Sequence, residues 1–258
     1  MKSVTFEDGL AIHGSFPDDD VLTLIFGTAG PLPLVIADPP YGNILSVEWD
    51  RINDDDRVFA NWMLDWTTKL APLCHEGAAA YIWGGIGRPS FRPFYRYLAN
   101  VEHDTPWTLA NHVTWKKKRA YGVQHNYLFT REELAYLTLG DPKRPRRFTV
   151  PLLAEKRGYA GYNAQYPAKS EYYHRTSVWT DVTEILRGKR HVAEKPSRLA
   201  EIPIEVHTTP GEWVLDPFAG SGSTADAARK LGRRWIMVER DADEFERLVA
   251  NLRRAVAA

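Results

Sequence analysis

The sequence predicts an α/β protein in which short buried strands alternate with amphipathic helices. Several apolar runs of four or five residues have the length and composition of strands that are buried on both faces. Helical patterns separate these runs, and acids, prolines or glycines follow them, where strands of a parallel sheet end. At 258 residues and 44% hydrophobic composition, the chain can bury the core of one sizeable domain that carries an insertion.

The apolar periodicity places the expected elements along the chain. Strands are predicted at 34–37, 79–83, 108–115, 213–215 and 235–238. Helices are predicted at 58–70, 134–139, 224–231 and 242–254. The helix at 134–139 rests on the capping-box spacing of Thr130 and Glu133. The helix at 58–70 places Val58, Trp62 and Trp66 on one apolar face, and we assign its tryptophans to packing. Residues 84–89 are predicted to form a loop at the edge of the sheet.

The most informative stretch is Asp38-Pro39-Pro40-Tyr41, which directly follows the first predicted strand. A carboxylate and the carbonyl before a proline can both accept hydrogen bonds from an NH2 group, and the prolines fix the backbone that aims them. The tyrosine offers a face on which a flat group can stack. The stretch therefore suits a planar, amino-bearing ligand, although an ordinary Pro-Pro turn is the simpler alternative.

A second motif lies near the other end of the chain. Asp216-Pro-Phe-Ala-Gly220-Ser-Gly222-Ser-Thr224 follows a predicted strand and leads into a helix, and Glu239 ends the next strand. Glycines let the backbone approach a ligand, and an acid at the next strand end can accept hydrogen bonds from ribose hydroxyls. The pattern indicates a nucleoside site. It also matches the G-x-G-x-x-A dinucleotide fingerprint, but a carboxylate directly before the turn suits a cationic amino-acid group better than a pyrophosphate.

Together, the two motifs resemble the permuted β class of AdoMet-dependent amino-methyltransferases that modify DNA bases. In that family a D/S-P-P-Y catalytic motif comes first, a target-recognition segment follows, and a K-P element and a D-P-F-x-G-S-G cofactor motif come last. The matching stretches here are 34–42, 79–84, 112–116, 194–196 and 214–241. The resemblance implies a Rossmann-like methyltransferase sheet with a circularly permuted motif order. We expect residues 1–140 and 191–258 to form the catalytic domain and 141–190 a small target-recognition insertion.

Residue by residue, the resemblance implies two sets of site residues. The catalytic set is Asp38, Pro39, Pro40 and Tyr41. The AdoMet-binding set is Lys195, Pro196, Asp216, Phe218, Gly220, Gly222, Ser223, Thr224 and Glu239. The chain departs from the family where a Gly-Asp pair often helps to place the cofactor adenine, because its counterpart here is His13-Gly14-Ser15. The residue that replaces this acid is not indicated by the sequence.

The implied reaction is methyl transfer from AdoMet to the exocyclic amino nitrogen of a base rotated out of double-stranded DNA. Asp at the first motif position is commoner in family members that act on adenine N6, and Ser in those that act on cytosine N4. We therefore expect adenine, with cytosine as the alternative. A catalytically silent DNA-binding paralogue is a further alternative from a different class. Restriction-modification is the setting that the resemblance suggests. The resemblance also implies a homodimer, whereas a cognate endonuclease is not required.

The charges are segregated along the chain although the net charge is zero. Residues 1–70 hold 4 Lys/Arg and 12 Asp/Glu, a net charge of −8, whereas residues 141–190 hold 11 and 5, a net charge of +6. Basic groups of this kind contact phosphates and fix the register of a protein on DNA, or simply form a solvated face. The predicted DNA-binding residues are Lys116, Lys117, Lys118, Arg119, Arg144, Arg146 and Arg147.

The remaining composition argues against other classes. A single cysteine, Cys74, excludes an intrachain disulfide and favours a reducing compartment, and no metal-ligand spacing is present. We place neither His112 nor His125 in the site. The first residues lack the apolar core of a signal peptide, and no apolar run reaches bilayer length. We therefore expect a soluble cytoplasmic protein that associates with the nucleoid through DNA.

Overall fold

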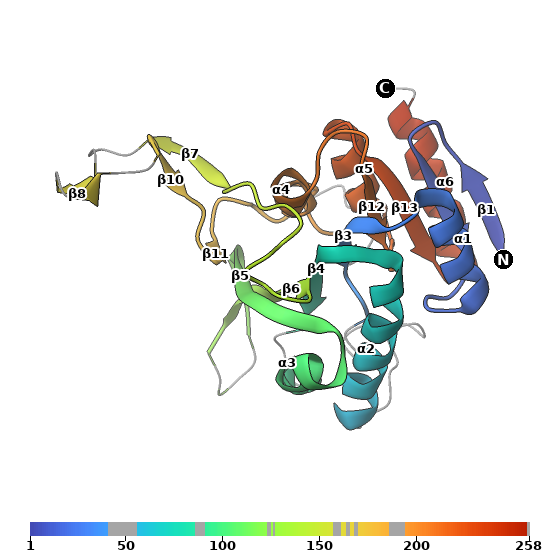
Figure 1. The fold of residues 1–258 in the computed structure, drawn as a ribbon, viewed down its shortest axis with the longest axis horizontal. Helices are drawn as coiled ribbons and strands as arrows, with labels where there is room; N and C mark the ends of the chain where they lie inside the picture. The colour runs from blue at the N-terminus through green and yellow to red at the C-terminus, as the bar shows by residue number, and fades with distance from the viewer. Residues whose placement is uncertain are drawn as a thin grey trace.

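The computed structural model describes residues 1–40, 56–85, 91–122, 125, 127–156, 161–163, 166–167, 170–185 and 194–256. Its elements, in chain order, are β1 (Lys2–Thr5), β2 (Gly9–His13), α1 (Asp19–Ala29), β3 (Leu32–Ala37), α2 (Asp56–Leu70), η2 (Ala71–Leu73), β4 (Cys74–Gly84), α3 (Phe91–Asp104), β5 (Trp107–Tyr121), β6 (Phe129–Leu139), β7 (Leu152–Lys156), β8 (Gly161–Asn163), β9 (Tyr166–Pro167), β10 (Tyr172–His174), β11 (Val178–Trp179), α4 (Arg198–His207), β12 (Trp213–Asp216), α5 (Ser223–Lys230), β13 (Arg234–Glu239) and α6 (Ala242–Val256). Figure 1 shows their arrangement.

Nine strands form one sheet in the order β1-β2-β13-β12-β3-β4-β6-β5-β11. The five strands from β2 to β4 run parallel to one another, and β6 is antiparallel to both of its neighbours. The C-terminal strands β12 and β13 thus lie between the N-terminal strands β2 and β3. The predicted α/β class and the permuted order of the two motifs are confirmed by this topology.

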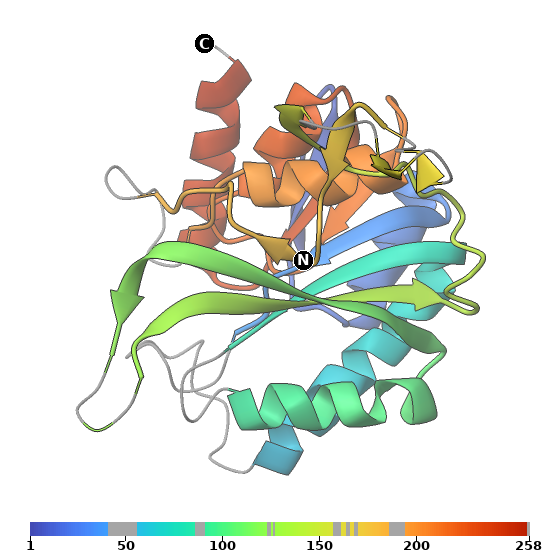
Figure 2. The same cartoon turned by 90° about the vertical axis from the view of Figure 1, so that its left-hand side faces the viewer.

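Helices cover both faces of the sheet because the strands are apolar on both faces. Val35 and Ala37 of β3 belong to a core that includes α1, α2 and α3. Leu34 and Ile36 point to the opposite core, which includes α4, α5 and α6. Figure 2 shows α2 and α3 on one side of the sheet and α4, α5 and α6 on the other. The result is a three-layer α/β/α arrangement.

The helix predicted at 134–139 is wrong, because these residues form the second half of β6. They pair in register with β4 on one side and with β5 on the other, and all six are buried or nearly so. For a six-residue apolar run buried between two strands, the hydrogen bonds of the sheet stabilise the strand more than a capping box would stabilise a helix. The other predicted strands and helices are confirmed within a few residues, although Val58 of α2 is exposed rather than packed.

The segment 141–190 has two parts in the structure. Its first residues lie along the main body, where Phe148 stacks on Tyr136 of β6, and β11 near its end pairs with β5 in the main sheet. Between them, β7 pairs with β10 and β8 pairs with β9, and Figure 1 shows these strands extending away from the body. The projecting part therefore spans only some of the residues 141–190.

Candidate active site

The two predicted motifs meet at one edge of the sheet. Strands β3 and β12 are parallel neighbours, with Val214 paired to Leu34 and Leu215 to Val35. Asp38 directly follows β3, and Asp216 ends β12. From this point the chain continues through α2 on one face and through α5 on the other. This is a topological switch point, the place where open α/β sheets bind ligands.

A cavity of about 250 Å³ lies at this switch point. This volume is slightly below the range of roughly 300–1,000 Å³ that is usual for ligand sites. The predicted residues that line it are Asp38, Pro39, Pro40, Lys195, Pro196, Asp216, Phe218, Gly220, Ser223, Thr224 and Glu239. Gly222 is not among the lining residues, and Tyr41 lies outside the described residues. The structure therefore brings the two motifs and the Lys-Pro element to one cavity.

The glycine turn after β12 needs glycine for its backbone and its packing. Gly220 and Gly222 have φ angles of 47° and 85°, in the left-handed region that side chains disfavour. A Cβ atom at Gly222 would also come within 2.7 Å of the Leu248 side chain in α6. Gly222 therefore lets the turn pack against α6, while Gly220 approaches the cavity.

Asp216 stabilises this turn through hydrogen bonds, and the residue is buried, with 4% exposed. Its Oδ2 accepts a hydrogen bond from the Thr224 hydroxyl at 2.6 Å, and its Oδ1 accepts one from the Phe218 N–H at 3.0 Å. Burial raises the pKa of Asp216 to about 7, and the nearby carboxylates of Asp38 and Glu239 add to the increase. A carboxylate desolvated in this way is stabilised by a bound cation.

Glu239 ends β13 and connects the turn to the next strand. Its Oε2 accepts a hydrogen bond from the Gly220 N–H at 3.0 Å, and its Oε1 accepts one from the Asp241 N–H at 2.9 Å. Burial raises its pKa. Each carboxylate oxygen retains a lone pair that can accept from a ribose hydroxyl, which is the role that the resemblance implies for this residue.

Lys195 lies between Asp38 and the antiparallel part of the sheet. Its ammonium group donates to the Asp38 carboxylate and lies 3.4 Å from Oε2 of Glu132 on β6. It also sits 4.9 Å from the centre of the Trp83 ring. Burial alone would lower the pKa of Lys195, but the Asp38 and Glu132 carboxylates outweigh burial and raise it. The lysine therefore stays charged beside Asp38.

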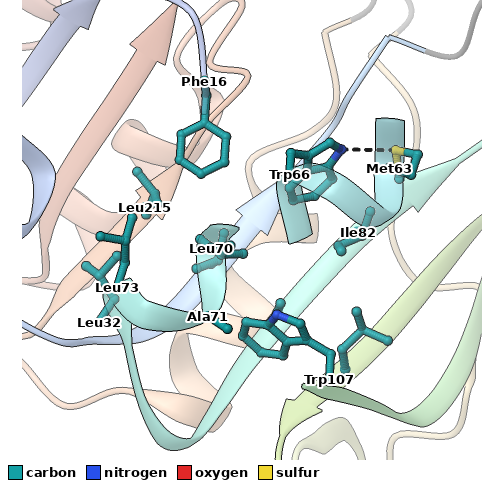
Figure 3. Packing of buried hydrophobic residues seen from close by; sticks show 14 of the residues in the cluster. Phe16, Leu32, Met63, Trp66, Leu70, Ala71, Leu73, Ile82, Trp107 and Leu215 are labelled. Atoms are coloured by element: carbon teal, nitrogen blue, oxygen red, sulfur yellow. Dashed lines mark hydrogen bonds between the residues drawn. The ribbon is translucent and has the colours of Figure 1, made fainter. Parts of the chain in front are cut away.

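Aromatic side chains form one wall of the cavity. Phe218 contacts Trp66 with ring centres 5.4 Å apart and Trp62 with ring centres 5.9 Å apart. Figure 3 shows Trp66 and Phe16 among the residues of the apolar core. Sequence reasoning assigned Trp62 to packing and Trp83 to a strand, yet both line the cavity. The position of Trp83 at the end of a parallel strand was the signal that could have identified it.

The predicted DNA-binding residues fall into two separate places. Lys116, Lys118 and Arg119 on β5 are exposed, whereas Lys117 is half-buried and pairs with Glu132. The group Arg144, Arg146 and Arg147 lies at the opposite edge of the parallel strands. There the Arg146 N–H donates to the carbonyl of Gly77, near the start of β4, and its guanidinium donates to Glu212, just before β12. This second group is remote from a base bound beside Asp38.

Neither a metal site nor a membrane span is found where the structure describes the chain. No group of three His, Cys, Asp or Glu side chains there could hold a metal ion. Of the helices in the described ranges, none is long and apolar enough to cross a bilayer.

The fold and the site together define a Rossmann-like methyltransferase. Three features of the cavity fit AdoMet. The desolvated acids Asp216 and Glu239 suit its cationic groups and ribose hydroxyls, and the glycine turn allows close approach of backbone. The aromatic wall around Phe218 suits its flat and apolar parts.

Comparisons with known proteins place the chain in one family. The family model described as DNA methylase, that of the N6 and N4 methyltransferases, matches residues 32–250. The type II methyltransferase M.BamHI of Bacillus amyloliquefaciens is 25% identical over 90% of this chain, which spans 53% of that protein. M2.DpnII of Streptococcus pneumoniae is 25% identical over 81% of this chain, which spans 77% of it. The chain belongs to the N6/N4 DNA methylase family, whose members use AdoMet.

Solved structures show the same fold. The PvuII DNA methyltransferase, described as cytosine-N4-specific, has a TM-score of 0.67 at 14% identity and is covered over 94% of its chain, against 98% of this one. The complex of M1.HpyAVI with SAM has a TM-score of 0.64 at 20% identity, with 98% of that chain and 94% of this one covered.

Proposed function

We propose that the protein is a site-specific DNA methyltransferase that methylates the exocyclic N6 of adenine in a base rotated out of the duplex. The observation that carries the proposal is the shared cavity. Asp38, Pro39 and Pro40 line it together with Asp216 and Glu239, so a target amine held at the first motif would lie beside a cofactor held at the second.

The chain's own residues would assist the transfer in two ways. AdoMet supplies a methyl group activated by a sulfonium, which leaves as a neutral thioether. The Asp38 carboxylate and the Pro39 carbonyl would accept hydrogen bonds from the target NH2, and this orients the lone pair toward the methyl group. They would also stabilise the positive charge that develops on the nitrogen before it releases a proton. Holding both reactants in one cavity supplies much of the remaining rate gain.

Tyr41 would stack on the extruded base and offset part of the unstacking cost, a few kcal/mol. Exposed Lys116, Lys118 and Arg119 on β5 would contact phosphates beside the site. The strands β7 to β10, which project from the body, are the part of 141–190 that we propose for target recognition. For Arg144, Arg146 and Arg147, the position at the far edge of the sheet gives no support to a contact with the same stretch of DNA.

The choice of adenine rests on the Asp38 position of the family motif, and cytosine N4 is the alternative with the same mechanism. Nucleoside mass spectrometry on DNA from a methylation-free host that expresses the chain tests both. We expect N6-methyladenine with the parent and none with Asp38→Ala. N4-methylcytosine would keep the mechanism and reverse the base. If neither methylated base is found although AdoMet still binds, the result contradicts the proposal and favours a silent paralogue.

A further inference from the structure

A buried row of alternating charges runs from Asp38 away from the cavity. Lys195 donates to Asp38 and contacts Glu132 at 3.4 Å, and Lys117 pairs with the other oxygen of Glu132. The side chains of Lys195 and Glu132 are only 12% and 16% exposed. Burial alone would raise the pKa of Glu132, but the two lysines outweigh burial and lower it. Glu132 is therefore a carboxylate held between two ammonium groups.

Glu132 reaches this row because β6 is a strand. Successive side chains of a strand point to opposite faces, so Glu132 faces Lys195 while its neighbour Glu133 faces away. Glu133 instead accepts a hydrogen bond from the Thr114 hydroxyl at 2.8 Å and pairs with Arg131 at 2.7 Å. Glu133 is fully buried and Glu132 partly buried on the same strand, yet only Glu132 belongs to the row. Glu132 does not line the cavity, so it would act through Lys195.

The row matters because Lys195 and the target amine would use the same acceptor. In the proposed reaction the Asp38 carboxylate accepts hydrogen bonds from the target NH2, and here it already accepts one from the Lys195 ammonium. A lysine that paired with Asp38 alone would neutralise it and weaken its effect on the positive charge that develops in the transition state. Glu132 places a second carboxylate at ion-pair distance from the ammonium, on the side away from the cavity.

We propose that Glu132 is a positioning residue for methyl transfer. By sharing the Lys195 ammonium, it preserves the negative charge with which Asp38 holds the target amine and favours the cationic methyl donor. The inference rests on the proposed function, since it assigns the same role to Asp38. It adds a residue outside the cavity on which turnover depends.

Steady-state kinetics on DNA test the proposal through a double-mutant cycle. We expect Glu132→Gln to lower kcat about tenfold, with the KM values for AdoMet and DNA changed by less than about twofold, because the loss is confined to the transition state. The double variant Glu132→Gln with Lys195→Met should recover part of that loss, since the ammonium that neutralises Asp38 is gone. Additive losses in the double variant would overturn the proposal.

Glu133→Gln is the matched control. It removes a buried carboxylate from the same strand but on the other face, so it should lower Tm at least as much as Glu132→Gln while kcat stays within about twofold of the parent. An equal loss of kcat in both variants would show a general effect of strand stability and would overturn the proposal.

A binding measurement separates this inference from the proposed function. Calorimetry gives the ratio of affinities for AdoMet and for S-adenosylhomocysteine, which lacks the sulfonium charge, and it requires no methyl transfer. Removing a negative charge near the site should lower this preference about threefold in Glu132→Gln, and the double variant should return toward the parent value. If the parent methylates no DNA, the proposed function fails, and this ratio alone decides whether Glu132 acts on the charge at the site. A ratio unchanged in Glu132→Gln overturns the inference.

Discussion

Asp216→Asn should make the cofactor-free protein more stable at alkaline pH, because it removes a buried negative charge without removing its hydrogen bonds. The asparagine carbonyl can accept from the Phe218 N–H as Oδ1 of Asp216 does now, and its NH2 can donate to the Thr224 hydroxyl oxygen. The side chain is of nearly equal volume, so the turn after β12 need not repack.

The magnitude follows from the pKa of Asp216, which burial raises from the ordinary 3.8 to about 7. At ~1.4 kcal/mol for each pH unit, the difference corresponds to about 4 kcal/mol. We expect Asp216→Asn to gain about half of this, because charge-assisted hydrogen bonds are exchanged for neutral ones. A gain of ~2 kcal/mol raises Tm by roughly 4–8 °C for a chain of this size.

The sign of the pH dependence is fixed by linkage. The folded state binds the Asp216 proton more tightly than the unfolded state, so the parent loses stability as pH rises from about 4 to about 7. The advantage of Asp216→Asn should therefore be largest at pH 8 and shrink as pH falls through 7 toward 4.

Thermal unfolding followed by circular dichroism at pH 5, 6, 7 and 8, without cofactor, measures this difference. Asp65→Asn is the control, because its side chain is 55% exposed on α2, where it pairs with Lys69. It should show little change at any pH. An Asp216→Asn variant that melts below the parent at pH 8, or whose gain is independent of pH, would refute the reasoning.

Four further outcomes are expected. Asp38→Ala should bind AdoMet within about threefold of the parent by calorimetry yet lose methyl transfer about 100-fold or more in a radiolabel assay; turnover near the parental rate would remove its assigned role. Glu239→Ala should weaken AdoMet binding about tenfold and leave kcat at saturation largely intact, and an unchanged Kd would exclude the ribose contact. Lys118→Ala should weaken binding to every DNA sequence and reduce the salt slope by about one in a fluorescence titration, whereas an unchanged slope would contradict a phosphate contact. Trp66→Ala, which empties a fully buried core position, should cost about 3–5 kcal/mol and lower Tm by roughly 10 °C, and a smaller loss would indicate that the core collapses onto the space.

The fold could be predicted from the sequence wherever local and tertiary signals agree. The runs at 34–37 and 235–238 are apolar on both faces and too short for helices, so they had to be parallel strands, and the residues that follow them had to share one edge. The helix prediction at 134–139 was wrong because a capping box is a local signal, whereas the pairing with β4 and β5 involves residues far away in sequence. Periodicity contains no information on such partners.

The part of the candidate site that lies at strand ends could also be predicted from the sequence. Asp38 directly follows a strand, and Asp216 and Glu239 each end one, so topology alone brings them together. Glu132 lies in the middle of a strand, and nothing local distinguishes it from Glu133. Its contact with Lys195 depends on the register between β4, β6 and β5, which only the folded structure gives. Arg146 illustrates the converse, because a basic cluster in sequence gave no indication of the sheet edge on which it lies.

The position of β12 and β13 between β2 and β3 has a consequence for synthesis of the enzyme. The strand that directly precedes Asp38, β3, is made early, but its neighbour β12 is made almost last. While the chain is still growing, β2 and β3 have no strand between them, and the acids and glycines that face Asp38 do not yet exist. The cavity that Asp38 shares with Asp216 and Glu239 can therefore form only after β12 and β13 have entered the sheet between β2 and β3.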